Sequence, residues 1–406
     1  MSYLTTAGVL SVILLGLAMP APADPGAGAA APRVFLWDAN SLAAARRRIA
    51  AGDKDLAPLV ESLKRQADEA LKQGPFSVID KKETPPSGDK HDYMSMGPYW
   101  WPDPNKPDGK PYIRRDGEVY KARGELDNAP MGKMASTVNV LAAAYYLTGH
   151  EPYAQHAAKL LRAWFLDDKT RMNPNLNYGQ AIPGITDGRG VGIIDTTCLV
   201  ELVDSVGLLE GSKEWAPADR KALQAWFQKY LAWLTDSKLG QEEARAKNNH
   251  GTWYDVQVAI FALFVGRQEI AKKVLAEARQ RIASQIEPDG RQPLELARTK
   301  SWDYSAMNLR GFFFLARLGE HVGEDLWRFK TPDGRCIRGA LDYLVPYLKD
   351  KERWATKQIT ALKPDRLALP LRLAAVRFGE PKYQERLEEV LGARKDWRLE
   401  LLWPRP

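Results

Sequence analysis

The sequence is a succession of amphipathic helical patterns joined by short turns, and strand patterns are scarce. Residues 217–235 show the helical spacing most clearly, because apolar residues recur there three, four and seven positions apart from Leu223. The same periodicity predicts two helices over residues 38–73 and single helices over residues 135–147, 153–165, 193–209, 217–235, 253–264, 268–286, 304–318, 337–348, 367–378 and 382–391. With few strands available, these helices must bury their apolar faces against one another.

The short turns favour antiparallel helix pairs. One turn, residues 148–152, combines a glycine that stops a helix with a proline that starts the next. Pairs packed around a common axis form an (α/α) toroid, here an incomplete barrel of six or seven helical hairpins whose loops build a cleft at one end. An α-solenoid is the alternative, but the chain has no constant repeat of 34 or 40 residues. We therefore predict an all-α fold and a single domain over residues 24–406.

Composition excludes several classes of protein. The 406 residues carry 58 Lys and Arg against 51 Asp and Glu, a net charge of +7, with no basic block of the kind that binds nucleic acid. Two cysteines and five histidines without zinc-site spacing predict neither a disulfide framework nor a metal site. A glycine-rich stretch at 184–192 lacks the strand and the Gly-Lys-Ser/Thr of a nucleotide site. We expect no metal, no cofactor and no nucleic-acid partner.

The N-terminus resembles a secretory signal. The first 23 residues are uncharged, residues 7–19 are apolar, and Ala21 and Ala23 fit an A-x-A cleavage site, so we predict cleavage after Ala23. No later stretch approaches 18 apolar residues, so the mature protein should not span a membrane. We expect a periplasmic or secreted monomer. An acidic polysaccharide is the natural extracellular partner for its positive charge.

Residues 76–125 stand apart from the helical patterns, because they are rich in Pro, Gly, Asp and aromatics. An irregular segment of this length inside a helical domain is typical of a lid or a substrate-binding loop. Its aromatic rings can stack on sugar faces, and Arg114 and Arg115 can pair with carboxylates. The alternative is a structural plug that closes one end of the toroid. The aromatic candidates are Tyr93, Tyr99, Trp100 and Trp101.

A second candidate is the motif Asn248-Asn249-His250, where a polar loop enters an apolar helix. Amide and imidazole groups at a helix N-terminus lie beside free backbone N–H groups and the positive end of the helix dipole, which suits a carboxylate ligand. In the alternative interpretation, one asparagine is an N-cap and the histidine has no function.

A third candidate is Tyr304, which is preceded by Arg298 and Lys300. Neighbouring cations lower the pKa of a phenol, and a phenolate base requires such a shift. The alternative is a core aromatic residue beside solvated basic ones. Arg189, in the glycine-rich stretch, is a candidate clamp for an acidic substrate.

The motifs Asn-Asn-His-Gly-Thr-Trp-Tyr at 248–254 and Tyr-Trp-Trp-Pro-Asp-Pro at 99–104 together resemble the (α/α)-toroid alginate lyase superfamily. This group includes polysaccharide lyase families 5 and 38, which cleave alginate or related polyuronates, and the proline-rich segment is more similar to family 38. The resemblance extends from about residue 76 to about residue 343. The family pattern is an Asn-His pair followed some fifty residues later by an Arg and a Tyr, and here Tyr304 lies 54 positions after His250.

The resemblance implies a lyase that cleaves 4-linked uronates by β-elimination without a cofactor. Donors must neutralise the uronate carboxylate so that C5 can lose its proton, a role for Asn249 supported by His250 and Arg298. Tyr304 then serves as base and acid when the C5 proton and O4 share a face, as in mannuronate and glucuronate; for guluronate, His250 is the better base and Tyr304 remains the acid. Expected substrate contacts are Asn248, Tyr93, Tyr99, Trp100, Trp101, Arg189, Trp253 and Tyr254.

Two other functions compete with this prediction. An inverting glycoside hydrolase on the same architecture would need two carboxylates spaced for a water molecule, with Asp187, Asp195, Glu287 and Asp303 as candidates. A non-catalytic polysaccharide-binding protein would use Trp100, Trp101 and the arginines alone. Unsaturated products would separate a lyase from both.

Overall fold

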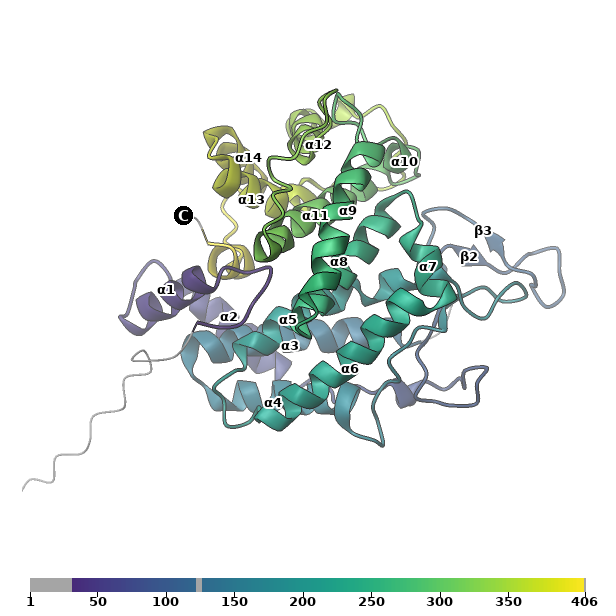
Figure 1. Cartoon of the computed structure of the whole chain (residues 1–406), viewed down its shortest axis with the longest axis horizontal. Coiled ribbons are helices and arrows are strands. Elements are labelled where there is room, and N and C mark those ends of the chain that lie inside the picture. The colour runs from purple at the N-terminus through teal and green to yellow at the C-terminus, as the bar shows by residue number, and fades with distance from the viewer. Residues whose placement is uncertain (1–30, 122–125, 405–406) are drawn as a thin grey trace, which may run out of the picture.

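The structure is a computed structural model that describes residues 31–121 and 126–404 (Figure 1). It is an (α/α) toroid, as predicted. The predicted signal peptide lies outside the described residues. The α-helices are α1 (Ala39–Ala50), α2 (Ala57–Ala70), α3 (Asn128–Thr148), α4 (Glu151–Leu161), α5 (Cys198–Leu208), α6 (Pro217–Asp236), α7 (Lys238–Ala244), α8 (Asn249–Phe264), α9 (Gln268–Gln285), α10 (Pro293–Leu296), α11 (Ser301–Gly319), α12 (Ile337–Leu344), α13 (Ala368–Phe378) and α14 (Pro381–Leu391). Across the described ranges, no helix is both long and apolar enough to cross a membrane.

The interior of the toroid is formed by α3, α5, α8 and α11, which pack against one another in sequence (Figure 1). These helices are apolar on nearly all sides, and α8 is buried along almost its whole length. A helix with this composition is stable only when other helices surround it. The outer helices α4, α6 and α9 pack against this inner set and bury one face each. Helices that are apolar on nearly all sides therefore form the inner layer, and helices with one apolar face form the outer layer.

The predicted helices are confirmed, with differences at their ends. The predicted turn at 148–152 is present: α3 ends at Thr148, Gly149 adopts φ +73°, and Pro152 lies in the first turn of α4. Residues 190–197 form a 3₁₀ helix before α5, so the helix predicted from 193 begins in a tighter form. Helix α8 begins at Asn249, four residues earlier than its apolar periodicity predicts. The short helices α7 and α10 were not predicted, because seven and four residues carry little periodicity.

The irregular segment is fixed to the helical frame by short strands. Strand β1 (Met94–Met96) pairs in parallel with β4 (Tyr178–Ala181), and β2 (Trp100–Trp101) pairs antiparallel with β3 (Ile113–Arg114). Figure 1 places β2 and β3 together at one edge of the molecule. Trp100 of β2 lies near the loop that follows β4, because the Arg189 guanidinium of that loop is 5.8 Å from its ring centroid.

A buried ion pair anchors the same segment to the start of α3. Lys81 Nζ lies 3.0 Å from Asp127 Oδ2, and each side chain is 1% exposed. The Met94 backbone N–H, on strand β1, donates to the same carboxylate oxygen at 2.8 Å. Burial raises the pKa of Asp127 to about 6 and lowers the pKa of Lys81, while each charge favours the ionised form of the other. The ion pair therefore connects the beginning of the irregular segment, its first strand and an inner helix.

Candidate active site

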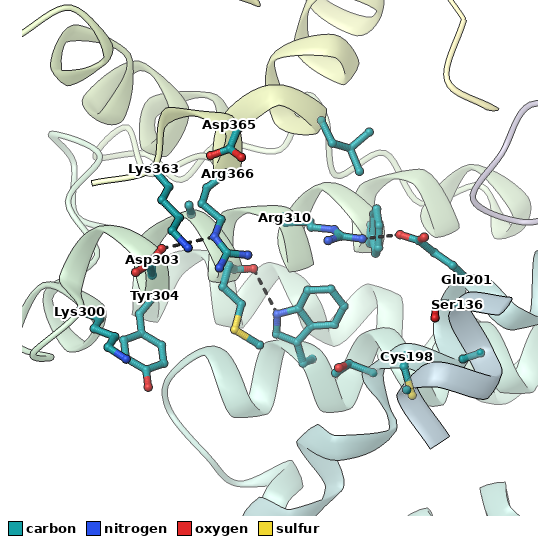
Figure 2. Close-up of a pocket in the computed structure, with 18 of the residues that line it drawn as sticks. Ser136, Cys198, Glu201, Lys300, Asp303, Tyr304, Arg310, Lys363, Asp365 and Arg366 are labelled. Atoms are coloured by element: carbon teal, nitrogen blue, oxygen red, sulfur yellow. Dashed lines mark hydrogen bonds and ion pairs between the residues drawn. The ribbon is translucent and has the colours of Figure 1, made fainter. Parts of the chain in front are cut away.

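Two cavities meet at Tyr304. The smaller, of about 400 Å³, is lined by predicted site residues from four parts of the chain: Tyr99, Trp100, Arg189, Asn248, Asn249, His250, Arg298 and Tyr304. The larger, of about 930 Å³, extends from Tyr304 along α11 (Figure 2). Tyr99, Tyr304 and Met307 line both cavities. A phenol, an imidazole and an amide that are distant in sequence therefore share one cavity.

Tyr304 lies in the first turn of α11, and its hydroxyl is 2.6 Å from the hydroxyl of Tyr99. The guanidinium of Arg298 lies over the phenol ring, 3.9 Å from its centroid. Burial raises the pKa of Tyr304 above its ordinary value, the hydrogen bond with Tyr99 raises it further, and Arg298 opposes both only in part. The sequence prediction of a lowered pKa is therefore wrong for the substrate-free protein, because desolvation outweighs the neighbouring cation.

Arg298 is held by a carboxylate from the irregular segment. Its Nη2 and Nε donate to the two carboxylate oxygens of Asp116 at 2.8 and 3.3 Å, and Thr299 donates to the same group from its backbone and its hydroxyl. The pKa of Asp116 is lowered because these donors outweigh its partial burial. Within the described ranges, Nη1 of Arg298 makes no hydrogen bond. One edge of the guanidinium is thus occupied by Asp116, and Nη1 can still donate to a ligand.

His250 is oriented by Glu243, a residue of α7. The imidazole Nδ1 lies 2.6 Å from Glu243 Oε1, and the Glu243 side chain is 1% exposed. A carboxylate accepts hydrogen bonds, so Nδ1 carries the proton, and among residues 31–121 and 126–404 Nε2 has no hydrogen-bond partner. The short helix α7 therefore fixes both the tautomer and the direction of the imidazole.

Asn249 is the first residue of α8, and Glu295 of α10 accepts hydrogen bonds from both its backbone and its side chain. The Asn249 backbone N–H donates to Glu295 Oε1 at 2.6 Å, and Nδ2 donates to Oε2 at 2.7 Å. Burial raises the pKa of Glu295 even though both bonds favour its charged form. An amide nitrogen carries two hydrogens, so one remains for a ligand. Asn248 occupies the N-cap position, but its side chain makes no capping bond and lines the cavity instead.

Arg189 faces the smaller cavity from the loop after β4. Its Nε and Nη2 donate to the backbone oxygen and the Oε1 of Gln180 at 2.8 and 3.0 Å, and its guanidinium lies 5.8 Å from the Trp100 ring centroid. Gln180 donates in turn to Asp195 at 2.8 Å. Within the described ranges, no carboxylate lies within ion-pair distance of Arg189. Arg189 is thus held in place without being neutralised, which suits binding of an anionic group.

Four predicted substrate contacts lie elsewhere. Tyr93 is fully buried and donates to Asp195, and Tyr254 is buried with its hydroxyl on the Leu234 carbonyl. Neither these two nor Trp101, which packs against Tyr120, is among the residues that line the two cavities. Trp253 lines only the larger cavity. Aromatic residues next to a motif in sequence alternate between core and cavity, because neighbouring positions on a helix or strand point in different directions.

The carboxylates expected of a hydrolase do not gather in one place. Asp195 accepts hydrogen bonds from Tyr93, Ser95 and Gln180 and is not among the lining residues of either cavity. Asp303 lies on the wall of the larger cavity, beside Arg366. Neither Asp187 nor Glu287 is among the lining residues of either cavity. The described residues also contain no cluster of side chains suited to a metal ion.

Sequence reasoning missed the three carboxylates that hold the site: Asp116, Glu243 and Glu295. Each is far in sequence from the residue it holds or lies beyond a helix break, so no spacing pattern marks it. The hydrogen bond between Tyr99 and Tyr304 was also missed, since 205 positions separate the two phenols. The one signal in the sequence was that Glu243 lies only seven positions before His250, and this proximity identifies Glu243 only weakly.

Comparisons with known proteins agree on one family. The family model described as Alginate lyase matches residues 77–354. An alginate lyase from Bacteroides ovatus is 41% identical, with a TM-score of 0.88 over 92% of this chain and 99% of that chain. Alginate lyase A1-III from Sphingomonas species A1 is 18% identical, with a TM-score of 0.54 over 87% and 95%, and so shares the fold. A search of curated proteins finds no significant match. The chain therefore belongs to the alginate lyase family and is a polysaccharide lyase.

Proposed function

We propose that this enzyme cleaves 4-linked polyuronates such as polymannuronate or glucuronan by β-elimination at Tyr304. The observation that carries the proposal is the convergence of Tyr304, His250, Asn249 and Arg298 on one cavity. That cavity has three arginines and no carboxylate among its lining residues, which favours an acidic substrate. The 41% identity with an alginate lyase over nearly the whole chain supports the same substrate class.

Neutralisation of the substrate carboxylate is the first requirement, because the C5 proton of a uronate is otherwise too weakly acidic. The second Nδ2 hydrogen of Asn249 and the free Nη1 of Arg298 are the donors available for this carboxylate. Both donors are already oriented by buried or half-buried carboxylates, so little reorganisation accompanies binding. Donors held in place before the reaction stabilise the negative charge that develops in the transition state.

In the proposed reaction the small ionised fraction of Tyr304, which its raised pKa limits, takes the C5 proton of the bound sugar as phenolate. The electron pair of the C5–H bond forms the C4=C5 double bond, and the C4–O4 bond breaks. The leaving oxygen then takes the proton from Tyr304, which restores the phenolate. The products are a 4,5-unsaturated uronate and a free hydroxyl on the other fragment. This sequence requires the C5 proton and O4 on the same face of the sugar, as in mannuronate and glucuronate.

For guluronate, where the two groups lie on opposite faces, we propose that Nε2 of His250 removes the C5 proton and Tyr304 protonates O4. Glu243 supports this role, because its carboxylate stabilises the imidazolium that forms. The two bases line one cavity, so a single site can address either sugar.

The test is a substrate panel. Purified protein is incubated with polymannuronate, polyguluronate, mixed alginate and glucuronan, and the ultraviolet absorbance of the unsaturated uronate is followed. We expect absorbance to increase with polymannuronate or glucuronan. Saturated products with new reducing ends would indicate hydrolysis, and retention of polymer without new ends would indicate binding alone. Either of these results would refute the proposed function.

The pH profile should identify the base. Because the pKa of Tyr304 is raised, little phenolate exists at neutral pH, and kcat/KM on polymannuronate should rise with pH by about tenfold per unit up to about pH 9. An imidazole base would give a profile that levels off nearer neutrality. Initial rates across this range measure the difference. A polymannuronate profile that is already flat above about pH 7 would exclude a phenolate base with a raised pKa.

We also propose that the protein is exported, cut after Ala23 and active as a monomer. The proposal rests on the uncharged, apolar N-terminal segment and its A-x-A site. N-terminal sequencing of the protein recovered from the periplasm or medium tests the cleavage position.

A further inference from the structure

The start of α8 is held from the neighbouring outer helix α9. Gln285, the last residue of α9, is 4% exposed, and its Nε2 donates to the carbonyl of Asn248 at 3.3 Å. Asn248 is the N-cap residue of α8 and directly precedes Asn249. The Oε1 atom of the same glutamine accepts hydrogen bonds from the Thr252 hydroxyl at 3.1 Å and from Nδ2 of Asn308 at 3.0 Å. Gln285 therefore connects the backbone before Asn249 to helix α11.

Asn308 is the centre of this buried network. It lies on α11 four residues after Tyr304, which is about one helical turn. Its side chain is fully buried, and Nδ2 donates to two glutamines, Gln285 at 3.0 Å and Gln292 at 2.8 Å. An amide nitrogen carries two hydrogens, so both are used. Asn308 thus joins two further segments to the helix that carries Tyr304.

The second of these segments is the start of α10. Gln292 is the N-cap residue of α10, and its Nε2 also donates to the Ser305 carbonyl of α11 at 3.1 Å. The backbone oxygen of Gln292 accepts the Glu295 N–H at 3.0 Å, and Glu295 is the hydrogen-bond partner of Asn249. The starts of α8 and α10 meet in the Asn249–Glu295 pair. Asn308 is therefore connected to both sides of that pair.

Asn308 is an unfavourable residue for stability alone. Within the described ranges, its Oδ1 atom is buried and has no hydrogen-bond partner. A buried carbonyl without a partner destabilises a folded protein, and a leucine of similar shape would avoid this penalty. Packing therefore does not explain an asparagine at this position. A need to fix two helix starts relative to α11 explains it, because only an amide can donate to both glutamines.

We infer that Asn308 is a positioning residue that fixes Asn249 relative to Tyr304. It acts through Gln285 and Gln292, and it lines neither cavity. The inference rests on the proposed function and extends it to a residue that touches no substrate. The amide of Asn249 must reach the sugar carboxylate while the phenol reaches C5. A misplacement of about 1 Å in such a geometry lowers a rate by about 10²-fold.

The test is a double-mutant cycle on polymannuronate. Wild type, Asn308→Leu, Asn249→Ala and the double variant are compared by kcat/KM. Asn308→Leu alone should lower kcat/KM about 10- to 100-fold. In the Asn249→Ala background the same substitution should lower it by less than about threefold, because the amide that it positions is already absent. A merely structural role would give the same factor in both backgrounds.

Two further variants separate positioning from folding. Gln285→Met breaks the same network from α9, and it should show the same non-additivity with Asn249→Ala if Asn308→Leu does not fold. Gln257→Leu is the matched control, because this buried amide of α8 lines neither cavity and accepts a hydrogen bond from Thr196 instead. It should lower the melting temperature and keep kcat/KM within about threefold of wild type.

Equal losses in the two backgrounds would overturn the inference. Wild-type kcat/KM in both Asn308→Leu and Gln285→Met would overturn it as well. In either case the wild type still cleaves polyuronates, so the proposed function stands. If the wild type cleaves no polyuronate, the proposed function fails and the inference fails with it.

Discussion

Replacing Tyr304 with phenylalanine should lower kcat on polymannuronate by about 10²- to 10⁴-fold, the scale of a lost general acid–base group. The change removes one oxygen atom and keeps the ring beneath Arg298. Substrate binding should change little, because the neutralising donors Asn249 and Arg298 remain. Steady-state kinetics by ultraviolet absorbance measure kcat and KM separately.

A matched substitution controls for the loss of a tyrosine hydroxyl. Tyr153 of α4 is 4% exposed, and its hydroxyl donates to Asp68 at 2.7 Å away from both cavities. Tyr153→Phe should lower the free energy of unfolding by about 1 kcal/mol and leave kcat within about twofold of wild type. If Tyr304→Phe retains wild-type kcat on every substrate, Tyr304 is neither the base nor the acid.

Replacing Lys81 with methionine should lower the free energy of unfolding by about 3–5 kcal/mol at neutral pH, because Asp127 would be left buried without its counter-charge. In the folded protein the pKa of Asp127 is already raised to about 6, and the loss of Lys81 should raise it further. A carboxyl with a raised folded-state pKa destabilises the fold as pH increases above its unfolded value. Relative to wild type, the deficit should therefore be smallest below about pH 6, where Asp127 is protonated in both folded proteins, and should grow as the pH rises above about 6, where only the variant must still keep Asp127 protonated.

Denaturant unfolding at several pH values measures this deficit. Lys72→Met is the control, because the Lys72–Glu69 pair is 68% and 69% exposed and should contribute less than about 1 kcal/mol. The Lys81 variant should also lose activity, since the ion pair positions the segment that carries Tyr99 and Asp116. Equal stability of the two variants at neutral pH would show that Asp127 is not held as a buried charge.

The helical architecture could be predicted from the sequence because each element carries its own signal. The apolar spacing in α6 and the helix boundaries at Gly149 and Pro152 are local patterns, which can be read from a short stretch of sequence without knowledge of its neighbours in space. The positions of Asn249, His250, Arg298 and Tyr304 could likewise be selected as a set, and the structure brings all four to one cavity. Their catalytic roles remain proposals.

The surroundings of these residues could not be predicted. The sequence suggested that Arg298 would lower the pKa of Tyr304, but burial and Tyr99 raise it. Asp116 lies 182 positions before the arginine that it holds, and Glu295 lies 46 positions after Asn249. Tyr254 directly follows Trp253, which lines the larger cavity, but Tyr254 is buried with its hydroxyl on the Leu234 carbonyl. Contacts of this kind arise only when distant segments pack together.

The sequence by itself determined the helices, their pairing into a toroid and the choice of candidate site residues, because periodicity and residue chemistry are properties of short stretches. The tertiary structure alone decided which carboxylate contacts each of these residues and how strongly burial opposes the ionisation of Tyr304. The physical reason is that desolvation and charge pairing depend on everything within a few ångströms of a group, and most of those neighbours come from elsewhere in the chain.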